Sequence, residues 1–98
     1  MSELVLVRYT VAAGQADRNA ELVRAVYAEL GRAAPDGFRY ATLRESSAFT
    51  HVALHADGAR PLTELPAFRA FQAGLGERAV AGPEFSNPEL VGSYRLLD

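Results

Sequence analysis

The sequence predicts an α+β domain in which a strand–helix–strand unit occurs twice. Four short segments are rich in β-branched and aliphatic residues, and two longer segments between them carry apolar residues at helical spacing. The two helical segments also end alike, with Leu-Gly-Arg-Ala at 30–33 before Pro35 and Leu-Gly-Glu-Arg-Ala at 75–79 before Pro83. Because 98 residues is the length of one domain, we expect residues 1–98 to fold as a single unit.

The first half of the chain begins with a predicted strand at 4–11, which ends at a turn containing Gly14. An amphipathic helix follows from about Asp17, and either Asp17 or Asn19 could cap its start. Its apolar positions recur at helical spacing, and they are Leu22, Val23, Val26, Tyr27 and Leu30. Pro35 and Gly37 end this helix. Strands are then predicted at 38–43 and 49–55, joined as a hairpin by a tight turn at 45–47.

The second half begins with a short helical lead-in at 59–65. Pro66 suits the first position of the next helix, where a missing N–H is no loss. Phe68, Phe71, Leu75 and Ala79 form the buried stripe of that helix. After Gly82-Pro83 a last strand is predicted at 90–96, although its alternation is the poorest of the four.

This order of elements, βαββαβ, is ferredoxin-like. Right-handed crossovers place both helices on one face of a four-stranded antiparallel sheet. The other face stays open. Each strand carries apolar residues at both odd and even positions, so both faces of the sheet are apolar and the open face is too apolar to lie in water. We therefore expect a second copy of the chain to cover that face in a homodimer.

The composition excludes several kinds of chemistry. The chain has no cysteine and no lysine, which removes thiol nucleophiles, disulfides, Schiff-base enzymes and the P-loop lysine. The ten arginines are spread evenly among 12 acidic residues for a net charge of −2, so we expect no nucleic-acid partner. No apolar run approaches the ~18 residues of a membrane span, and no basic leader begins the chain, so we expect no membrane association and a cytoplasmic location.

From about Glu3 to Leu96 the chain resembles the dimeric α/β-barrel superfamily, in particular proteins grouped with the antibiotic biosynthesis monooxygenases. The resemblance lies in Leu-Val-Leu-Val-Arg-Tyr-Thr-Val at 4–11, Pro-Asp-Gly-Phe-Arg-Tyr at 35–40 and Pro-Ala-Phe-Arg-Ala-Phe at 66–71. It implies that two ferredoxin-like subunits pack their open sheet faces together around a ligand. The chain departs from the family at Ala53-Leu54-His55, where many members carry Glu-x-Trp, and at Ala67, where others carry histidine. Because the haem-degrading relatives depend on a tryptophan that this chain lacks, we do not expect haem degradation.

The two histidines of the third predicted strand are the first candidate functional residues. Alternate side chains of a strand share a face, so Phe49, His51, Ala53 and His55 point the same way. Residues 50, 52 and 54 are a cleaner apolar set, which we expect to pack on the helices. The histidine face would then line the dimer cavity. His51 and His55 lie ~13 Å apart along a strand, so we expect no metal site, and no organic cofactor is expected either.

The other candidate residues follow from the same parity argument. On the first strand the more polar face, which carries Arg8, should point into the cavity, and Tyr40 should join it from the second strand. The last strand would contribute Tyr94, or else Ser93 and Arg95. In this interpretation His51 is a catalytic base and Arg8 holds the resulting enolate. Substrate would be bound by Tyr40, Phe49, His55 and Tyr94. The alternative is that His51 and Arg8 only form hydrogen bonds across the dimer.

Two functions stay open on the sequence alone. The first is a cofactor-independent monooxygenase, or a related enzyme of enolate chemistry, that acts on an aromatic or polyketide-like small molecule. The second is a non-catalytic dimeric barrel that binds a small ligand or serves in a stress response. Acylphosphatases and RNA-recognition modules share the element order, but residues 11–18 lack a glycine-rich phosphate cradle and residues 47–55 lack an aromatic-rich signature.

Overall fold

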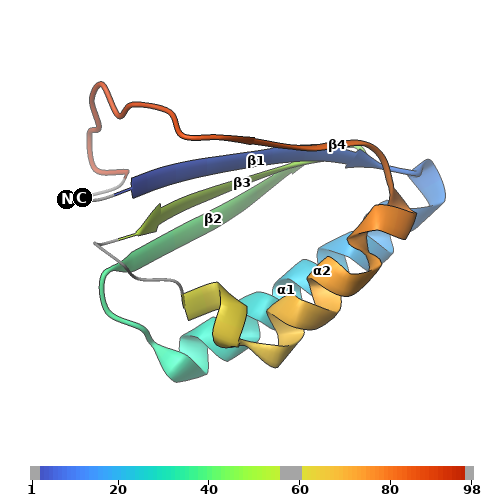
Figure 1. The fold of residues 1–98 in the computed structure, drawn as a ribbon, viewed down its shortest axis with the longest axis horizontal. Helices are drawn as coiled ribbons and strands as arrows, with labels where there is room; N and C mark the ends of the chain where they lie inside the picture. Colours follow the sequence, from blue (N-terminus) through green and yellow to red (C-terminus); the bar gives the residue numbers. More distant parts are fainter. Residues whose placement is uncertain (1–2, 56–60, 97–98) are drawn as a thin grey trace.

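The structure is a computed structural model that describes residues 3–55 and 61–96, and it has two layers (Figure 1). One layer is a four-stranded antiparallel sheet in the order β2-β3-β1-β4, and the other is a pair of helices on one of its faces. The elements are, in chain order, β1 (Glu3–Val11), η1 (Ala13–Gln15), α1 (Ala16–Ala33), β2 (Phe38–Glu45), β3 (Ala48–His55), η2 (Pro61–Glu64), α2 (Pro66–Arg78) and β4 (Ala79–Ser86). The predicted ferredoxin-like fold is confirmed.

Helix α1 forms where the apolar periodicity predicts it, and Val23 and Val26 are buried on its inner face. It begins one residue before Asp17, so neither Asp17 nor Asn19 caps it, and the expectation of such a cap is wrong. Asn19 instead lies on the buried face of α1 and is fully inaccessible to solvent. The helix ends where Ala34 takes a left-handed conformation with φ of 43°, directly before Pro35.

Helix α2 begins at Pro66, as predicted, and packs beside α1. The backbone N–H of Ala67 donates to Glu29 Oε1 of α1 at 2.9 Å, which supplies one of the first-turn N–H groups with a partner. Its buried residues are Phe71, Leu75 and Arg78. The expected stripe is right at Phe71 and Leu75, but Phe68 is only half-buried and Ala79 already belongs to β4. Among the described helices, none is long and apolar enough to cross a membrane.

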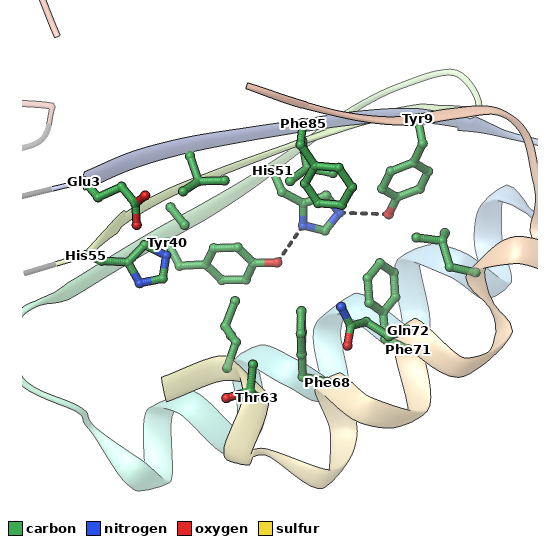
Figure 2. A pocket seen from close by; sticks show the side chains of 15 residues that line it. Glu3, Tyr9, Tyr40, His51, His55, Thr63, Phe68, Phe71, Gln72 and Phe85 are labelled. Carbon is green, nitrogen blue, oxygen red and sulfur yellow. Dashed lines mark hydrogen bonds between the residues drawn. The ribbon is translucent and has the colours of Figure 1, made fainter. Parts of the chain in front are cut away.

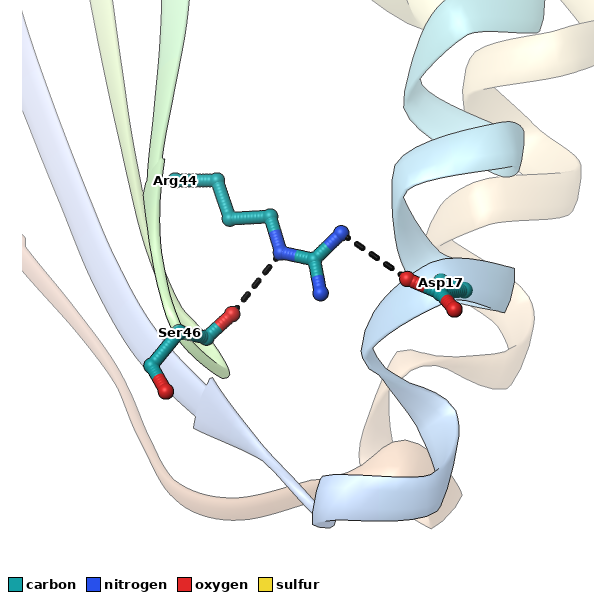
Figure 3. A network of polar contacts seen from close by, with 3 residues as sticks. All are labelled: Asp17, Arg44 and Ser46. Carbon is teal, nitrogen blue, oxygen red and sulfur yellow. Dashed lines mark hydrogen bonds and ion pairs between the residues drawn. The ribbon is translucent and has the colours of Figure 1, made fainter.

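A polar contact ties the hairpin to the start of α1. Arg44 in β2 donates through Nε to the carbonyl of Ser46 at 2.8 Å and through Nη1 to Asp17 at 3.1 Å (Figure 3). Ser46 has a φ of 58° in the two-residue turn between β2 and β3. The contact therefore joins the tip of the hairpin to the first turn of the helix.

The prediction of a last strand at 90–96 is wrong. The fourth strand, β4, follows α2 directly and pairs antiparallel with β1, from Val11 opposite Ala79 to Leu6 opposite Ser86. Gly82-Pro83, which the sequence suggests is a break, lies inside this strand at a shift in register. Gly82 has a φ of 79°, and a Cβ there would come within 2.7 Å of a backbone oxygen of β1. Because β4 is an edge strand, it tolerates a proline.

The expected assignment of the two faces of β3 is also wrong. The buried residues of β3 are Phe49, His51, Ala53 and His55, so the histidine face packs toward the helices. In the register of the sheet Tyr9 lies opposite Phe49, and Tyr9 is buried with it against the helices. The opposite parity, residues 50, 52 and 54, lies on the open face and is only half-buried. A polar residue can occupy a core position when its hydrogen bonds are satisfied there, and this is the case for His51.

Candidate functional site

A cavity of about 300 Å³ lies between the inner face of the sheet and the layer of η2 and α2 (Figure 2). Most of its wall is apolar, formed by Val5, Val7, Ala53, Leu62, Phe68, Phe71, Leu75 and Phe85. The polar residues that line it are Glu3, Tyr9, Tyr40, His51, His55, Thr63 and Gln72. An aromatic, largely apolar chamber with a few polar groups is the usual form of a small-molecule site.

His51 lies at the centre of the polar wall, between two tyrosines. Its Nε2 is 2.8 Å from the Tyr9 hydroxyl, and its Nδ1 is 2.6 Å from the Tyr40 hydroxyl. Figure 2 shows both bonds, with the Tyr40 ring extending along the cavity. Both ring nitrogens of His51 are therefore engaged by phenol groups. The strand register explains the arrangement, because Tyr9 and Tyr40 come from the two strands that flank β3.

The hydrogen bonds continue from Tyr9 into the core. Asn19 Nδ2 donates to the Tyr9 hydroxyl at 2.9 Å, and Arg78 Nε donates to Asn19 Oδ1 at 3.0 Å. Arg78 also donates through Nη2 to the carbonyl of Phe71 at 2.9 Å. A Cβ at Gly74 would come within 2.6 Å of Arg78 Nη1, so the glycine leaves room for the guanidinium. Arg78, Asn19, Tyr9, His51 and Tyr40 thus form one chain, which we call the polar chain.

A short branch leaves the polar chain at His51. Thr42 Oγ1 is 3.1 Å from His51 Nδ1 and 2.8 Å from the Tyr27 hydroxyl. The Tyr27 ring stacks on Tyr40, with centroids 5.1 Å apart. The Tyr27 ring thereby supports the Tyr40 side chain, whose hydroxyl bonds His51.

Burial sets the protonation of the polar chain. It lowers the pKa of His51 to about 4, because the charged imidazolium would lose its hydration. Burial raises the pKa of Tyr9 to about 12, against a smaller opposing effect of the bond from Asn19. The pKa of Tyr40 is raised further, again mainly by burial. At neutral pH His51 is therefore a neutral imidazole and both tyrosines keep their protons.

His55 lies at another position on the same wall, four residues along β3 from His51. It is 7% exposed, and its Nδ1 is buried with no hydrogen-bond partner among the described residues. Glu3 is its cross-strand neighbour and also lines the cavity. An unsatisfied buried nitrogen of this kind costs ~1–3 kcal/mol.

The structure brings together three of the predicted site residues, Tyr40, His51 and His55, on the helix side of the sheet. Phe49 is in the core, where it stacks on Tyr9 at 5.6 Å and does not line the cavity. Arg8 is exposed and has the parity of the opposite face, so the structure does not bring it together with His51. Tyr94 lies outside the sheet and is 80% exposed, so it does not line the cavity either.

Sequence reasoning missed Tyr9, Asn19 and Arg78 as site residues. A signal was present for two of them, because each is a polar residue on the apolar face of its helix. Asn19 is four residues before Val23, and Arg78 is three residues after Leu75. No group of three or more histidine, cysteine or acidic side chains in residues 3–55 and 61–96 is arranged to hold a metal ion.

Solved structures with the same fold include named oxygenases. A candidate antibiotic biosynthesis monooxygenase from Caulobacter crescentus is 18% identical, with a TM-score of 0.74 over 93% of this chain and 91% of that one. SnoaB of Streptomyces nogalater, a cofactor-independent oxygenase solved as a point mutant, is 19% identical, with a TM-score of 0.68 over 96% and 97%. A protein of unknown function from Nitrosomonas europaea is 22% identical, with a TM-score of 0.71 over 96% and 94%.

No protein-family model matches the chain, and no curated protein matches its sequence. At these identities the structural likeness establishes the fold that the chain shares with these proteins. Since one fold can carry many activities, its chemistry has to be argued from the cavity.

Proposed function

We propose that the protein binds a flat, mainly aromatic small molecule in the cavity between the sheet and α2 and catalyses its cofactor-independent oxygenation or a related reaction of its enolate. The observation that carries this proposal is the apolar, phenylalanine-lined cavity with the Tyr9–His51–Tyr40 hydrogen bonds in its wall. The fold shared with SnoaB, whose name describes a cofactor-independent oxygenase, supports the proposal.

The size and lining of the cavity favour a compact ring system. A volume of about 300 Å³ lies at the lower end of the ~300–1,000 Å³ that is usual for small-molecule sites. Phe68 and Phe71 contribute aromatic faces from α2, with ring centroids 6.0 Å apart, and Phe85 lines the cavity from β4. Aromatic side chains pack well on aromatic ligands, so we expect a substrate of about two or three fused rings.

The two histidines would have different roles in this reaction. Both nitrogens of His51 are bonded to tyrosines, so His51 holds Tyr40 in place and has no free nitrogen to take a proton from the substrate. His55 also lines the cavity and is not bonded to either tyrosine, so it is the better candidate for the group that accepts the substrate's acidic proton. The Tyr40 hydroxyl would stabilise the resulting oxyanion.

The proposal is tested with anthrone, a three-ring ketone that enolises readily. We expect the protein to accelerate oxygen uptake by anthrone, and we expect Tyr40→Phe and His55→Gln each to lower the rate by ~10²-fold or more. Tyr94→Phe is the matched control, because it removes a phenol hydroxyl from an exposed side chain outside the cavity. Equal rates for the wild type and both cavity variants would refute the catalytic proposal.

A second candidate function is binding of such a ligand without turnover. It is favoured by the state of His51, which has a pKa of about 4, is neutral and has both ring nitrogens hydrogen-bonded. A histidine in this state contributes to the wall of a binding site without exchanging protons with the ligand. Under this alternative anthrone binds and Tyr40→Phe weakens the binding, but oxygen uptake stays at the rate without protein. Absence of anthrone binding would refute both candidates for this class of ligand.

We further propose that two copies associate through the open face of the sheet. That face carries Leu6, Val52 and Leu54, and none of the described helices lies over it. The segment after β4 lies on the same side of the sheet in Figure 1, and Leu96 contributes to a small pocket with Val52 and Leu54. Apolar faces of this kind are normally covered by another layer.

A further inference from the structure

We infer that Arg78, acting through Asn19 and Tyr9, fixes which nitrogen of His51 carries the proton and so makes the Tyr40 hydroxyl a hydrogen-bond donor to the ligand. The ligand atom beside Tyr40 is then a hydrogen-bond acceptor, such as a carbonyl or enolate oxygen. This inference rests on the proposed binding of an aromatic small molecule in the cavity and names the polar group that such a molecule carries.

Arg78 fixes the orientation of the Asn19 amide. A guanidinium has only donors, so the Asn19 atom that faces Arg78 Nε at 3.0 Å must be the amide oxygen. The amide nitrogen therefore faces Tyr9, at 2.9 Å from its hydroxyl oxygen. Because an amide nitrogen can only donate, the Tyr9 oxygen is an acceptor in this bond. Asn19 is completely buried, so no solvent competes for these positions.

The orientation of Asn19 sets the direction of the hydrogen bond between Tyr9 and His51. The Tyr9 oxygen accepts a hydrogen bond from Asn19, so the Tyr9 O–H must donate to a different group. The acceptor within reach is His51 Nε2, at 2.8 Å. The reverse arrangement would leave the proton of a 4%-exposed phenol without an acceptor among the contacts of the described residues. His51 Nε2 is thus an acceptor and carries no proton.

The proton of the His51 imidazole lies on its other ring nitrogen, Nδ1. His51 is a neutral imidazole at neutral pH and holds one proton, which must be on Nδ1. Nδ1–H donates to the nearest oxygen, the Tyr40 hydroxyl at 2.6 Å. The Tyr40 oxygen thus accepts from His51, and its own proton can go either to Thr42, with which the Tyr40 hydroxyl is also hydrogen-bonded, or to a ligand on the cavity side.

Among the described residues, Thr42 is the one competitor for the Tyr40 proton. Its Oγ1 lies next to the His51–Tyr40 pair, at 3.1 Å from Nδ1, and it also bonds Tyr27. Thr42→Val keeps the shape of the side chain and removes that oxygen. If the inference is right, this variant should bind a carbonyl ligand at least as tightly as the wild type does.

The central experiment reads the tautomer of His51 directly. Long-range ¹H–¹⁵N correlation spectra of the wild type should show Nδ1 protonated and Nε2 bare. Asn19→Asp supplies a carboxylate, which can accept from Arg78 and from Tyr9 at once. The Tyr9 proton then turns away from His51, Nε2 becomes protonated, and Tyr40 donates to Nδ1. Asn87→Asp makes the same change of charge at an exposed residue and should leave the tautomer as in the wild type.

The consequence for ligands is measured with 9-fluorenone and fluorene, two planar molecules that differ by a carbonyl oxygen. The wild type should prefer fluorenone, and Tyr40→Phe and Asn19→Asp should each lower this preference by about 5–10-fold, the equivalent of one hydrogen bond. Asn87→Asp should keep it.

Each outcome bears on the inference. A wild-type His51 protonated at Nε2 overturns it, and so does an unchanged tautomer in folded Asn19→Asp. If Asn19→Asp does not fold, the wild-type spectrum still decides the direction of the chain. If neither fluorenone nor fluorene binds, the proposed ligand class fails while the tautomer result stands separately.

Discussion

His51 should make the stability of this protein depend on pH in the mildly acidic range. The imidazole is 5% exposed and enclosed by the rings of Tyr9, Tyr40 and Phe71, with centroids 5.4, 5.8 and 5.5 Å away. In the folded chain its pKa is about 4, whereas an exposed histidine has a pKa of 6.5. Between these values the unfolded chain binds a proton that the folded chain does not. Stability must therefore fall as the pH falls from 6.5 to 4.

The size of the effect follows from the difference in pKa. One unit corresponds to about 1.4 kcal/mol, so the full loss approaches ~3–4 kcal/mol below pH 4, and ~2–3 kcal/mol of it should appear between pH 7 and pH 4.5. Because His51 is almost completely buried, solvent screens this loss very little. For a domain of this size the loss is a large fraction of the total stability.

The assay compares urea unfolding of the wild type and of His51→Gln at pH 7 and pH 4.5. The variant keeps polar atoms at this position but cannot take up a proton, so the contributions of all other titrating groups cancel in the comparison. Between the two pH values the wild type should lose ~2–3 kcal/mol more than the variant, a difference in midpoint of ~1–2 M urea. Equal losses in the two proteins would show that His51 is not a neutral, buried histidine in the folded state.

Three further outcomes are expected. In thermal unfolding, Gly82→Ala should destabilise the protein by more than ~1 kcal/mol, because the φ of Gly82 is 79° and the added Cβ would collide with the backbone. In the same assay Gly31→Ala should stabilise the protein by ~0.5–1 kcal/mol, because Gly31 lies in α1 with open space around it. In sedimentation equilibrium the wild type should be a dimer and Val52→Arg a monomer, because burying an unpaired charge in the dimer interface is energetically costly. A monomeric wild type at micromolar concentration would contradict the proposed association. Arg44→Gln should cost less than ~1 kcal/mol, because its partner Asp17 is 91% exposed, and a larger loss of stability would show that this contact holds the hairpin to α1.

The fold was predictable from the sequence because its signals are local. The helical spacing from Leu22 to Leu30 predicted α1, and Pro66 marked the first residue of α2. The hairpin followed from two β-rich segments and a short turn. Each of these patterns depends on neighbours within a few residues, so no knowledge of distant contacts was needed. Tyr40, His51 and His55 were chosen as site residues on similar grounds, as chemically capable side chains of one parity.

Only the tertiary structure decided where the fourth strand lies and which face of the sheet is buried. β4 was missed because its place depends on pairing with β1, and a proline is tolerated at that edge although its own sequence suggests a break. The face of β3 was misassigned because a histidine looks solvent-facing until its partners are known. Tyr9 and Tyr40 satisfy both nitrogens of His51 from the neighbouring strands. The other members of the polar chain come from helices: Asn19 is 10 residues from Tyr9 along the sequence, and Arg78 is 59 residues from Asn19. Burial of a polar group depends on whether hydrogen-bond partners surround it, and in this protein only the folded chain brings those partners together.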